Sequence, residues 1–169
     1  TIPLGVADIY NTWMNKPVSN GHSVLDNSAD LNPVVDAIDF IGLNYHPYWG
    51  GFDPHSGKAA PHVLSSAQDI VERFNNKTVI VTETGFPSAG ESHTTIDGTA
   101  TPDIGALSLF LTDMEAVSRK ENLAVYMFEP YDGDWKRRWE PYAVADYNFG
   151  LATCDRKMKN IKLPPLGAI

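Results

Sequence analysis

Four short apolar stretches, each ending in a polar or acidic residue, narrow the choice of fold more than any other feature. They are "IPLGVAD" (2–8), "AIDFIGLNY" (37–45), "TVIVTE" (78–83) and "LAVYMFE" (123–129). Their near-continuous apolar character is typical of parallel strands that are covered on both faces. The sequence therefore predicts a parallel sheet whose strands carry polar side chains at their carboxyl ends.

Helical patterns separate these stretches. Apolar residues recur at helical spacing across 31–38 and across 67–74. The third pattern, 102–121, is the most complete, with Thr101 as the expected N-cap and Pro102 at the first helical position. This alternation of strands and helices predicts an α/β fold with right-handed crossovers.

Two α/β architectures fit the alternation. A doubly wound sheet usually has a Gly-rich phosphate loop after its first strand, and "GVADIYNTW" contains no such loop. In a (β/α)8 TIM barrel, chemistry gathers at the carboxyl ends of several strands, which here carry Asp8, Tyr45, Glu83 and Glu129. A complete barrel has eight strands and about 250 residues. We therefore expect residues 1–169 to form the C-terminal half of one catalytic barrel domain (strands 5–8), without its N-terminal half.

Charge and cysteine content argue against several functional classes. A net charge of −8 argues against nucleic acid or an anionic membrane face as a partner. No apolar run approaches the roughly 18 residues of a membrane span. Cys154 is the only cysteine and there is no HExxH motif. We expect no nucleic-acid partner, no membrane span, no metal and no cofactor.

Glu83 ends the stretch "VIVTE", where a carboxylate loses much of its hydration. Such a glutamate is either paired with Lys or Arg or catalytic, and its surroundings favour catalysis. Glu129 and Asp132 come at and after the end of the next stretch, with Lys136 close behind. Neighbouring carboxylates in a partly dry site shift one another's pKa values, which suits acid, base or nucleophile roles.

Aromatic residues crowd the same strand ends. Core packing explains any single one of them, but as a set they look like platforms for sugar rings. Together with the carboxylates they indicate carbohydrate chemistry. They include Tyr45, Tyr48, Trp49, Phe52, Phe86, Trp135 and Trp139.

Four segments carry a resemblance to a known family. "VTETGFPSAG" (81–90) resembles the nucleophile motif of glycoside hydrolase family 17, the β-1,3-glucanases and glucanosyltransferases. "LNYHPYWGG" (43–51) is similar to the segment that ends the sixth strand in that family. "VYMFEPYDGDWK" (125–136) and "VADYNFGL" (144–151) resemble its last strand and the loop that follows, especially in fungal cell-wall members.

This resemblance implies a (β/α)8 barrel and a retaining mechanism. Glu83 would be the nucleophile that forms a covalent glycosyl-enzyme, with Tyr45 hydrogen-bonded to it. The sugar-binding residues expected from the resemblance and from the aromatic set are Tyr45, Tyr48, Trp49, Phe86, Glu129, Asp132, Trp135, Lys136 and Asp146.

The sequence departs from the family pattern in three places. The acid/base Glu of the family ends a strand that would precede residue 1, so we expect it to be absent from this chain. Gly133 and Asp146 each stand where the family usually has Glu. Half a barrel exposes two strand edges. We therefore expect the N-terminal half of the barrel, as a separate chain or fragment, to be a partner.

The expected substrate is β-1,3-glucan, in an enzyme of the secreted or cell-wall type. A sequon at Asn76–Thr78 is compatible with secretion. Hydrolysis and transglycosylation both fit the motifs. Two alternatives stay open, namely a non-catalytic glucan-binding cell-wall protein and a retaining barrel glycosidase acting on β-1,4-linked glucan or mannan.

Overall fold

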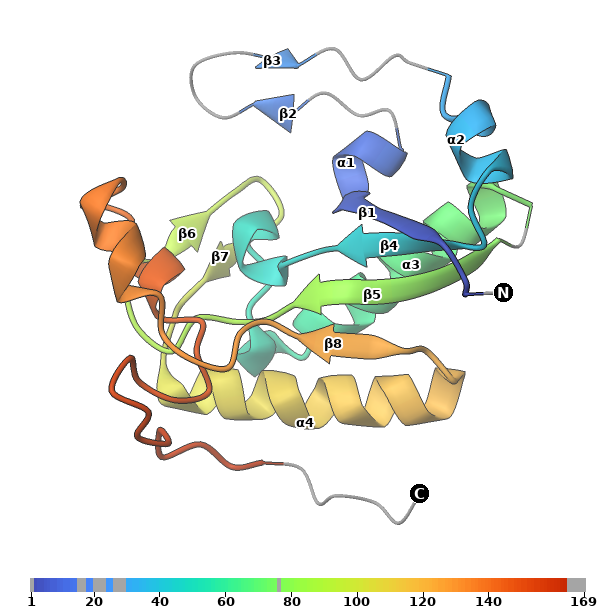
Figure 1. Ribbon diagram of the computed structural model, residues 1–169. Coiled ribbons are helices and arrows are strands. Elements are labelled where there is room, and N and C mark those ends of the chain that lie inside the picture. The colour runs from blue at the N-terminus through green and yellow to red at the C-terminus, as the bar shows by residue number, and fades with distance from the viewer. Residues whose placement is uncertain (1, 15–17, 20–23, 26–29, 76, 164–169) are drawn as a thin grey trace.

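A computed structural model describes residues 2–14, 18–19, 24–25, 30–75 and 77–163 of the chain (Figure 1). Asn76 of the sequon lies outside the described residues. No helix within the described ranges has the length and apolar character needed to cross a membrane.

A four-stranded parallel sheet forms the centre of the described chain. Its strands follow one another in the order β1-β4-β5-β8, which is also their order in the sequence. Each strand falls within or overlaps one of the four apolar stretches, so the predicted parallel sheet is confirmed. The bounds are Gly5–Ile9 for β1, Phe40–Asn44 for β4, Thr78–Thr84 for β5 and Val125–Met127 for β8.

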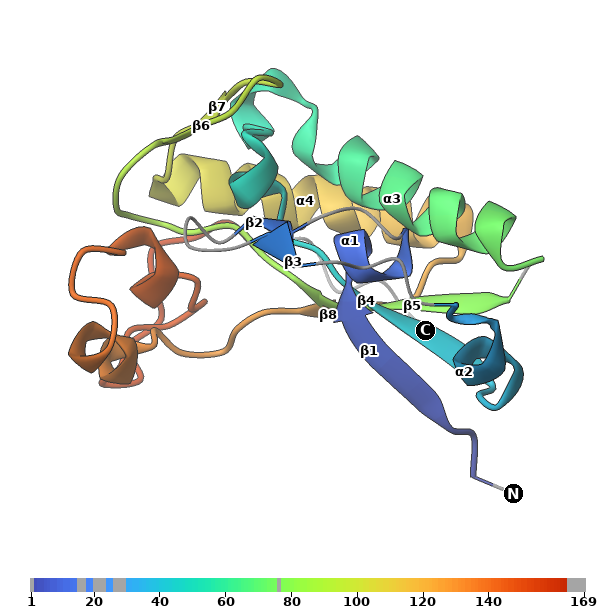
Figure 2. The same cartoon turned by 90° about the horizontal axis from the view of Figure 1, so that it is seen from above.

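Two long helices, α3 (Ala59–Arg73) and α4 (Ile104–Glu121), cover one face of this sheet (Figure 2). Val63 of α3 and Phe110 of α4 are fully buried in the core that the helices form with the sheet. The described residues also form two short helices, α1 (Tyr10–Trp13) directly after β1 and α2 (Asn32–Asp36) before β4.

The helix starts differ from the expected ones. The Asp103 side chain caps α4 by accepting a hydrogen bond from the Ala106 N–H at 2.6 Å, so the expectation of Thr101 as the cap was wrong. Thr101 instead donates its backbone N–H to Asp53 at 2.8 Å. α3 starts at Ala59, ahead of the predicted pattern, because buried Ala59 and Ala60 extend its apolar face.

Short elements and loops surround the carboxyl ends of the strands. After β8 the described chain has two 3-10 turns, η3 and η4, and isolated β-bridges at Ala152, and backbone hydrogen bonds hold this region together. Leu151 N donates to Glu129 O at 3.0 Å and Gly133 N donates to Tyr147 O at 2.9 Å. The short elements are β2 (Val18–Ser19), β3 (Val24–Leu25), η1 (Pro47–Gly50), η2 (Pro54–Ser56), β6 (His93–Thr94), β7 (Thr99–Ala100), η3 (Asp134–Arg138) and η4 (Ala145–Tyr147).

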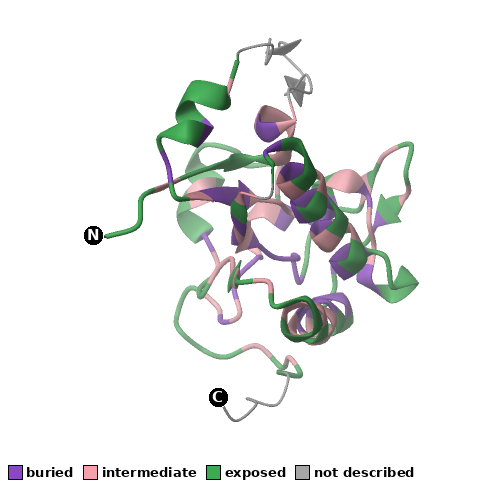
Figure 3. Cartoon of the chain, turned by 90° about the vertical axis from the view of Figure 1, so that its right-hand side faces the viewer, coloured by how far each residue is buried: buried purple, intermediate pink, exposed green. Residues whose placement is uncertain are grey.

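The outer strands of the sheet are less covered than the middle ones. Ile41 and Leu43 of β4 are fully buried, whereas Val6 and Ile9 of β1 are 40% and 41% exposed. Tyr126 of β8 is 64% exposed. Buried residues concentrate in the sheet and on the inner sides of the helices, and the segment that leads from the N-terminus is exposed (Figure 3).

Candidate active site

A β-bulge sets the position of Glu83 at the carboxyl end of β5. Leu43 of β4 pairs with Val81, but the next residue, Asn44, pairs with Glu83, so two residues of β5 oppose one of β4. Such a bulge redirects the side chains that follow it. The Glu83 side chain is 42% exposed, and Tyr45 N–H donates to the Glu83 carbonyl at 2.8 Å. Glu83 is thus fixed through its backbone while its carboxylate stays accessible.

His46 adjoins that carboxylate, with its Nε2 3.8 Å from Glu83 Oε2. The rings of Phe128 and Phe149 lie edge-on to the imidazole, at centroid distances of 5.3 and 5.1 Å. Burial lowers the pKa of His46 to about 4. The imidazole is therefore neutral at neutral pH, and it lies beside Glu83 as a polar group rather than as a counter-ion.

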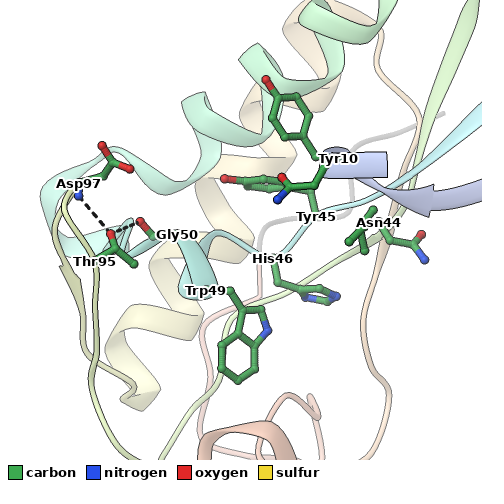
Figure 4. A pocket seen from close by; sticks show the side chains of 10 residues that line it. Tyr10, Asn44, Tyr45, His46, Trp49, Gly50, Thr95 and Asp97 are labelled. Atoms are coloured by element: carbon green, nitrogen blue, oxygen red, sulfur yellow. Dashed lines mark hydrogen bonds between the residues drawn. The ribbon is translucent and has the colours of Figure 1, made fainter. Parts of the chain in front are cut away.

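A cavity of about 480 Å³ opens on the β4 side of Glu83; we call it the aromatic cavity (Figure 4). His46, whose Nε2 is 3.8 Å from the Glu83 carboxylate, is one of its lining residues. Its other lining residues come from the ends of β1 and β4, from η1 and from the β6–β7 hairpin. They include Tyr10, Asn44, Tyr45, Trp49, Thr95 and Asp97.

The β6–β7 hairpin is tied to η1 at the rim of this cavity. Thr95 Oγ1 donates to the Gly50 carbonyl at 2.9 Å, and Asp97 N–H donates to Thr95 Oγ1 at 3.1 Å (Figure 4). Gly51 has a φ of 75°, and a Cβ there would meet the Gly98 carbonyl oxygen at 2.4 Å. Glycine at this position lets the hairpin approach the turn that carries Trp49.

Tyr45 lies in the cavity wall, but its hydroxyl does not make the expected bond to Glu83. The hydroxyl is 3.2 Å from His62 Nδ1, and the two rings are stacked at 5.5 Å. The link to Glu83 runs through the backbone instead. Burial raises the pKa of Tyr45 to about 12, against a hydrogen bond from Ser66 that lowers it.

Tyr48 and Phe86 were expected to bind sugar, and the structure places both in the core. Both side chains are fully buried. The Tyr48 hydroxyl donates to the Glu91 carbonyl at 2.8 Å, and the Phe86 ring packs against Tyr48 and Phe110. Neither ring has an exposed face for a ligand. Trp49, the neighbour of Tyr48 on η1, is 44% exposed and lines the cavity.

On the β8 side of Glu83 the charged residues gather around Lys136; we call Lys136, Glu129 and Asp146 the lysine cluster. Lys136 Nζ is 3.4 Å from Glu129 Oε1, 3.4 Å from Asp146 Oδ2 and 2.9 Å from the Asp146 carbonyl. Burial raises the pKa of Glu129, and Lys136 opposes that rise. A cavity of about 250 Å³ adjoins the cluster and is lined by Trp135 and Trp139. Three of the expected sugar-binding residues are therefore brought together here, next to an exposed tryptophan.

Asp132 forms its ion pair with a different lysine, Lys159. Its Oδ1 is 2.5 Å from Lys159 Nζ and accepts from Gly150 N–H at 3.0 Å. Both side chains are at most 10% exposed, and Lys159 also donates to Ser88 Oγ at 2.6 Å. Asp132 is thus a loop anchor in this structure, and no sequence pattern pointed to its partner Lys159.

The described residues contain no group of three or more His, Cys, Asp or Glu side chains that could hold a metal ion. A carboxylate at a strand end, flanked by an aromatic cavity and a charged cluster, is an arrangement suited to a polyhydroxylated ligand. A profile of the BtgE/BtgC glycoside hydrolase domain matches residues 6–150 of the chain. The chain belongs to this family.

Curated relatives of this BtgE/BtgC-type chain support the assignment, and the expected resemblance to glycoside hydrolase family 17 is confirmed. The chain is 32% identical over 156 residues to a glucan 1,3-beta-glucosidase of Schizosaccharomyces pombe, covering 87% of this chain and 43% of the relative. It is 24% identical over 176 residues to a putative glucan endo-1,3-beta-glucosidase, btgC, of Aspergillus niger, covering 98% and 23%. The BtgE/BtgC-type chain thus spans less than half the length of these relatives.

Solved structures of glycan-active enzymes share the fold of this chain. The chain superimposes on a glycoside hydrolase family 17 beta-1,3-glucanosyltransferase from Rhizomucor miehei with a TM-score of 0.72 at 23% identity, covering 96% of this chain and 51% of that chain. For an endo-laminarinase from Formosa the TM-score is 0.72 at 17% identity, covering 94% and 45%. The BtgE/BtgC-type fold described here corresponds to about half of each neighbour.

Proposed function

We propose that this chain carries the nucleophile of a retaining glycosidase or glucanosyltransferase that acts on β-1,3-glucan. The substrate class follows from the relatives, among them a glucan 1,3-beta-glucosidase and a β-1,3-glucanosyltransferase. The observation that carries the role of Glu83 is the bulge between Val81 and Glu83. It presents an accessible carboxylate at the carboxyl end of β5, between the aromatic cavity on the β4 side and the lysine cluster on the β8 side.

In the proposed reaction, a Glu83 oxygen attacks the anomeric carbon and the bond to the aglycone oxygen breaks. The aglycone oxygen takes a proton from a general acid as it leaves. The deprotonated acid then takes a proton from water, or from a hydroxyl group of another glucan chain, as that oxygen attacks the anomeric carbon; the bond to Glu83 breaks and its carboxylate is restored. His46, which is neutral at neutral pH and 3.8 Å from Glu83, is not a counter-ion to the proposed nucleophile.

The proposed glucan contacts come from both sides of Glu83. Trp49 and Tyr45 offer ring surfaces in the aromatic cavity. On the other side, Lys136, Glu129 and Asp146 are polar partners for sugar hydroxyl groups, with Trp135 68% exposed beside them. Asp132 supports this side indirectly, because its ion pair with Lys159 fixes the loop.

The general acid is proposed to come from the other half of a (β/α)8 barrel. Retaining chemistry uses two carboxyl groups about 5–5.5 Å apart. β1 and β8 are the two edges of the sheet, and β1 carries exposed apolar side chains at Val6 and Ile9. An edge of this kind is suited to pairing with a further strand. An N-terminal half, on the same or a separate polypeptide, would cover both edges and bring the acid next to β1.

Because β-1,3-glucan is a polymer of cell walls, we also propose that the protein works outside the cell. Detection of the protein in the culture medium or cell-wall fraction of its source would support this location. Confinement to the cell interior would contradict it.

A trapping experiment tests the nucleophile without the general acid. An activated 2-deoxy-2-fluoro-β-laminaribioside has a leaving group that needs no protonation, so Glu83 alone suffices for glycosylation. We expect the intact mass of the chain to rise by one fluoroglycosyl unit, and peptide mapping to place it on Glu83. Glu83→Gln should remain unlabelled, whereas Glu72→Gln, an exposed glutamate on α3, should be labelled like the wild type. Labelling elsewhere, or none with a folded chain, contradicts the proposal.

A further inference from the structure

A polar stripe runs along α3 behind the aromatic cavity. His62, Ser66 and Asp69 are spaced at i, i+4 and i+7, so they lie on one side of the helix. Ser66 is only 1% exposed, so its polar side chain is buried beside the apolar face of α3. Buried polar groups need hydrogen-bond partners. The partners of this stripe show what it does.

Two tyrosine hydroxyl groups from other elements bond to the stripe. Tyr10, on α1, donates its hydroxyl to Asp69 Oδ2 at 2.5 Å. The Tyr45 hydroxyl, at the end of β4, lies 3.2 Å from His62 Nδ1, and Ser66 Oγ lies 3.3 Å from the same nitrogen. The stripe therefore holds one ring from each of two neighbouring strand ends.

The two rings form a continuous surface in the cavity. Tyr10 and Tyr45 meet edge to face, with centroids 5.9 Å apart and planes at 85° (Figure 4). Both residues line the cavity, while their hydroxyl groups bond to α3. Ring carbons are left as the surface that a ligand meets. An aromatic surface of this kind suits the C–H face of a pyranose better than its hydroxyl groups.

We propose that His62, Ser66 and Asp69 position Tyr10 and Tyr45 as an apolar wall of the cavity, against which the C–H face of a glucosyl unit of β-1,3-glucan packs. This inference rests on the proposed function for the identity of the sugar. His62, Ser66 and Asp69 are positioning residues, because they act on the ligand through the two tyrosines. The environment of the phenols agrees with the geometry, since burial and Asp69 raise the pKa of Tyr10 to about 12.

The test measures laminaritriose affinity by calorimetry for the wild-type protein and four variants. His62→Phe keeps a ring to stack on Tyr45 and removes Nδ1. Asp69→Ala removes the acceptor for Tyr10, whereas Asp69→Asn keeps an acceptor oxygen without the charge. Glu72→Gln is the matched control, because it removes a charge from an exposed position on the same helix. Circular dichroism confirms that each variant is folded.

We expect His62→Phe and Asp69→Ala each to weaken laminaritriose binding about five- to tenfold, which corresponds to the loss of one hydrogen bond that orders a ring. Asp69→Asn and Glu72→Gln should stay within about twofold of the wild type. In an alkaline absorbance titration, Asp69→Asn should ionise a tyrosine at lower pH than the wild type, because the carboxylate that raises the pKa of Tyr10 is gone.

The outcomes separate this inference from the proposed function. If the wild type binds laminaritriose and His62→Phe and Asp69→Ala bind it equally well, the positioning role is wrong and the function stands. The positioning role is also wrong if Asp69→Asn is as weak as Asp69→Ala, or if its tyrosine titration is unchanged. If the folded wild type does not bind laminaritriose, the proposed function fails, and the glucosyl assignment of the wall fails with it.

Discussion

On the β4 side of Glu83 the cavity wall consists of aromatic rings whose hydroxyl groups bond to helix α3, whereas on the β8 side the cleft is built from charged residues on loops. The first wall stands on a helix packed against the sheet. The second belongs to a region whose described part has two 3-10 turns and isolated β-bridges, in which the lysines Lys136 and Lys159 bridge separate segments.

This contrast shows two ways to fix functional side chains at the end of a sheet. A helix supplies regular spacing, so hydrogen bonds to His62 and Asp69 orient the rings without an ion pair. A long loop has no such frame, and its buried charges need a counter-charge in place. We expect the loop wall to depend strongly on its lysines and the helix-backed wall to be insensitive to single charges.

The largest effect is expected for Lys159→Met. Removing this lysine leaves the Asp132 carboxylate buried without its counter-charge, in a pair that is at most 10% exposed. Breaking a buried pair from one side costs about 3–5 kcal/mol. Urea denaturation should therefore show a loss of unfolding free energy in this range.

The double variant Lys159→Met with Asp132→Asn is the control for this prediction. It removes the stranded charge, so it should regain part of the lost stability. A double variant no more stable than Lys159→Met alone would show that Lys159 acts through packing rather than through the ion pair.

A slightly smaller effect is expected from His46, which lies between the two walls. Burial lowers its pKa from 6.5 to about 4 in the folded chain. The folded state therefore binds this proton less readily than the unfolded state, and the stability that is present above pH 6.5 is lost as the pH falls towards 4. A shift of this size is linked to about 3 kcal/mol.

His46→Gln should remove this part of the acid sensitivity. We expect the unfolding free energy of the variant to fall less steeply than that of the wild type between neutral pH and pH 4. His55→Gln, at a histidine whose side chain is 49% exposed, is the matched control and should keep the steep profile. Parallel profiles for His46→Gln and the wild type would contradict the assignment.

Lys136→Met tests the lysine cluster, with an expected loss of about 2 kcal/mol because Glu129 and Asp146 are more exposed than Asp132. Without Lys136 the pKa of Glu129 should rise further, since the lysine opposes the effect of burial. Protonation of Glu129 then relieves the unpaired charge, so the variant should recover stability as the pH falls through that raised pKa. Urea denaturation across the acidic range measures this recovery. A deficit independent of pH would contradict it.

The strands and the position of Glu83 could be predicted because they depend on local patterns. Buried parallel strands need unbroken apolar runs, and a carboxylate at the end of one is visible in the sequence. Trp49 was named as one of the aromatic residues that crowd the strand ends, and it lines the cavity. Tyr48, next to it, was misassigned because a 3-10 turn directs adjacent side chains to different sides, and Tyr48 points into the core.

The supporting residues could not be predicted, because their partners are distant in the sequence. Lys159 is 27 residues from Asp132, and Tyr10 is 59 residues from Asp69. Nothing in the segment around Lys159 distinguishes it from Lys157, which stands two residues earlier. Only the folded loop buries one lysine and leaves the other in solvent.

The smallest effect on stability is expected for Lys157→Met. This variant tests whether burial of the ion pair causes the large effect expected for Lys159→Met. Lys157 Nζ is 2.7 Å from Asp155 Oδ2, close to the 2.5 Å of the Lys159–Asp132 pair, but its side chain is 80% exposed. Water screens an exposed pair, so little stability depends on it. We expect the urea midpoint of Lys157→Met to match that of the wild type. If it falls as far as that of Lys159→Met, the number of positive charges on this loop, rather than the burial of one of them, stabilises the β8 side of the cleft.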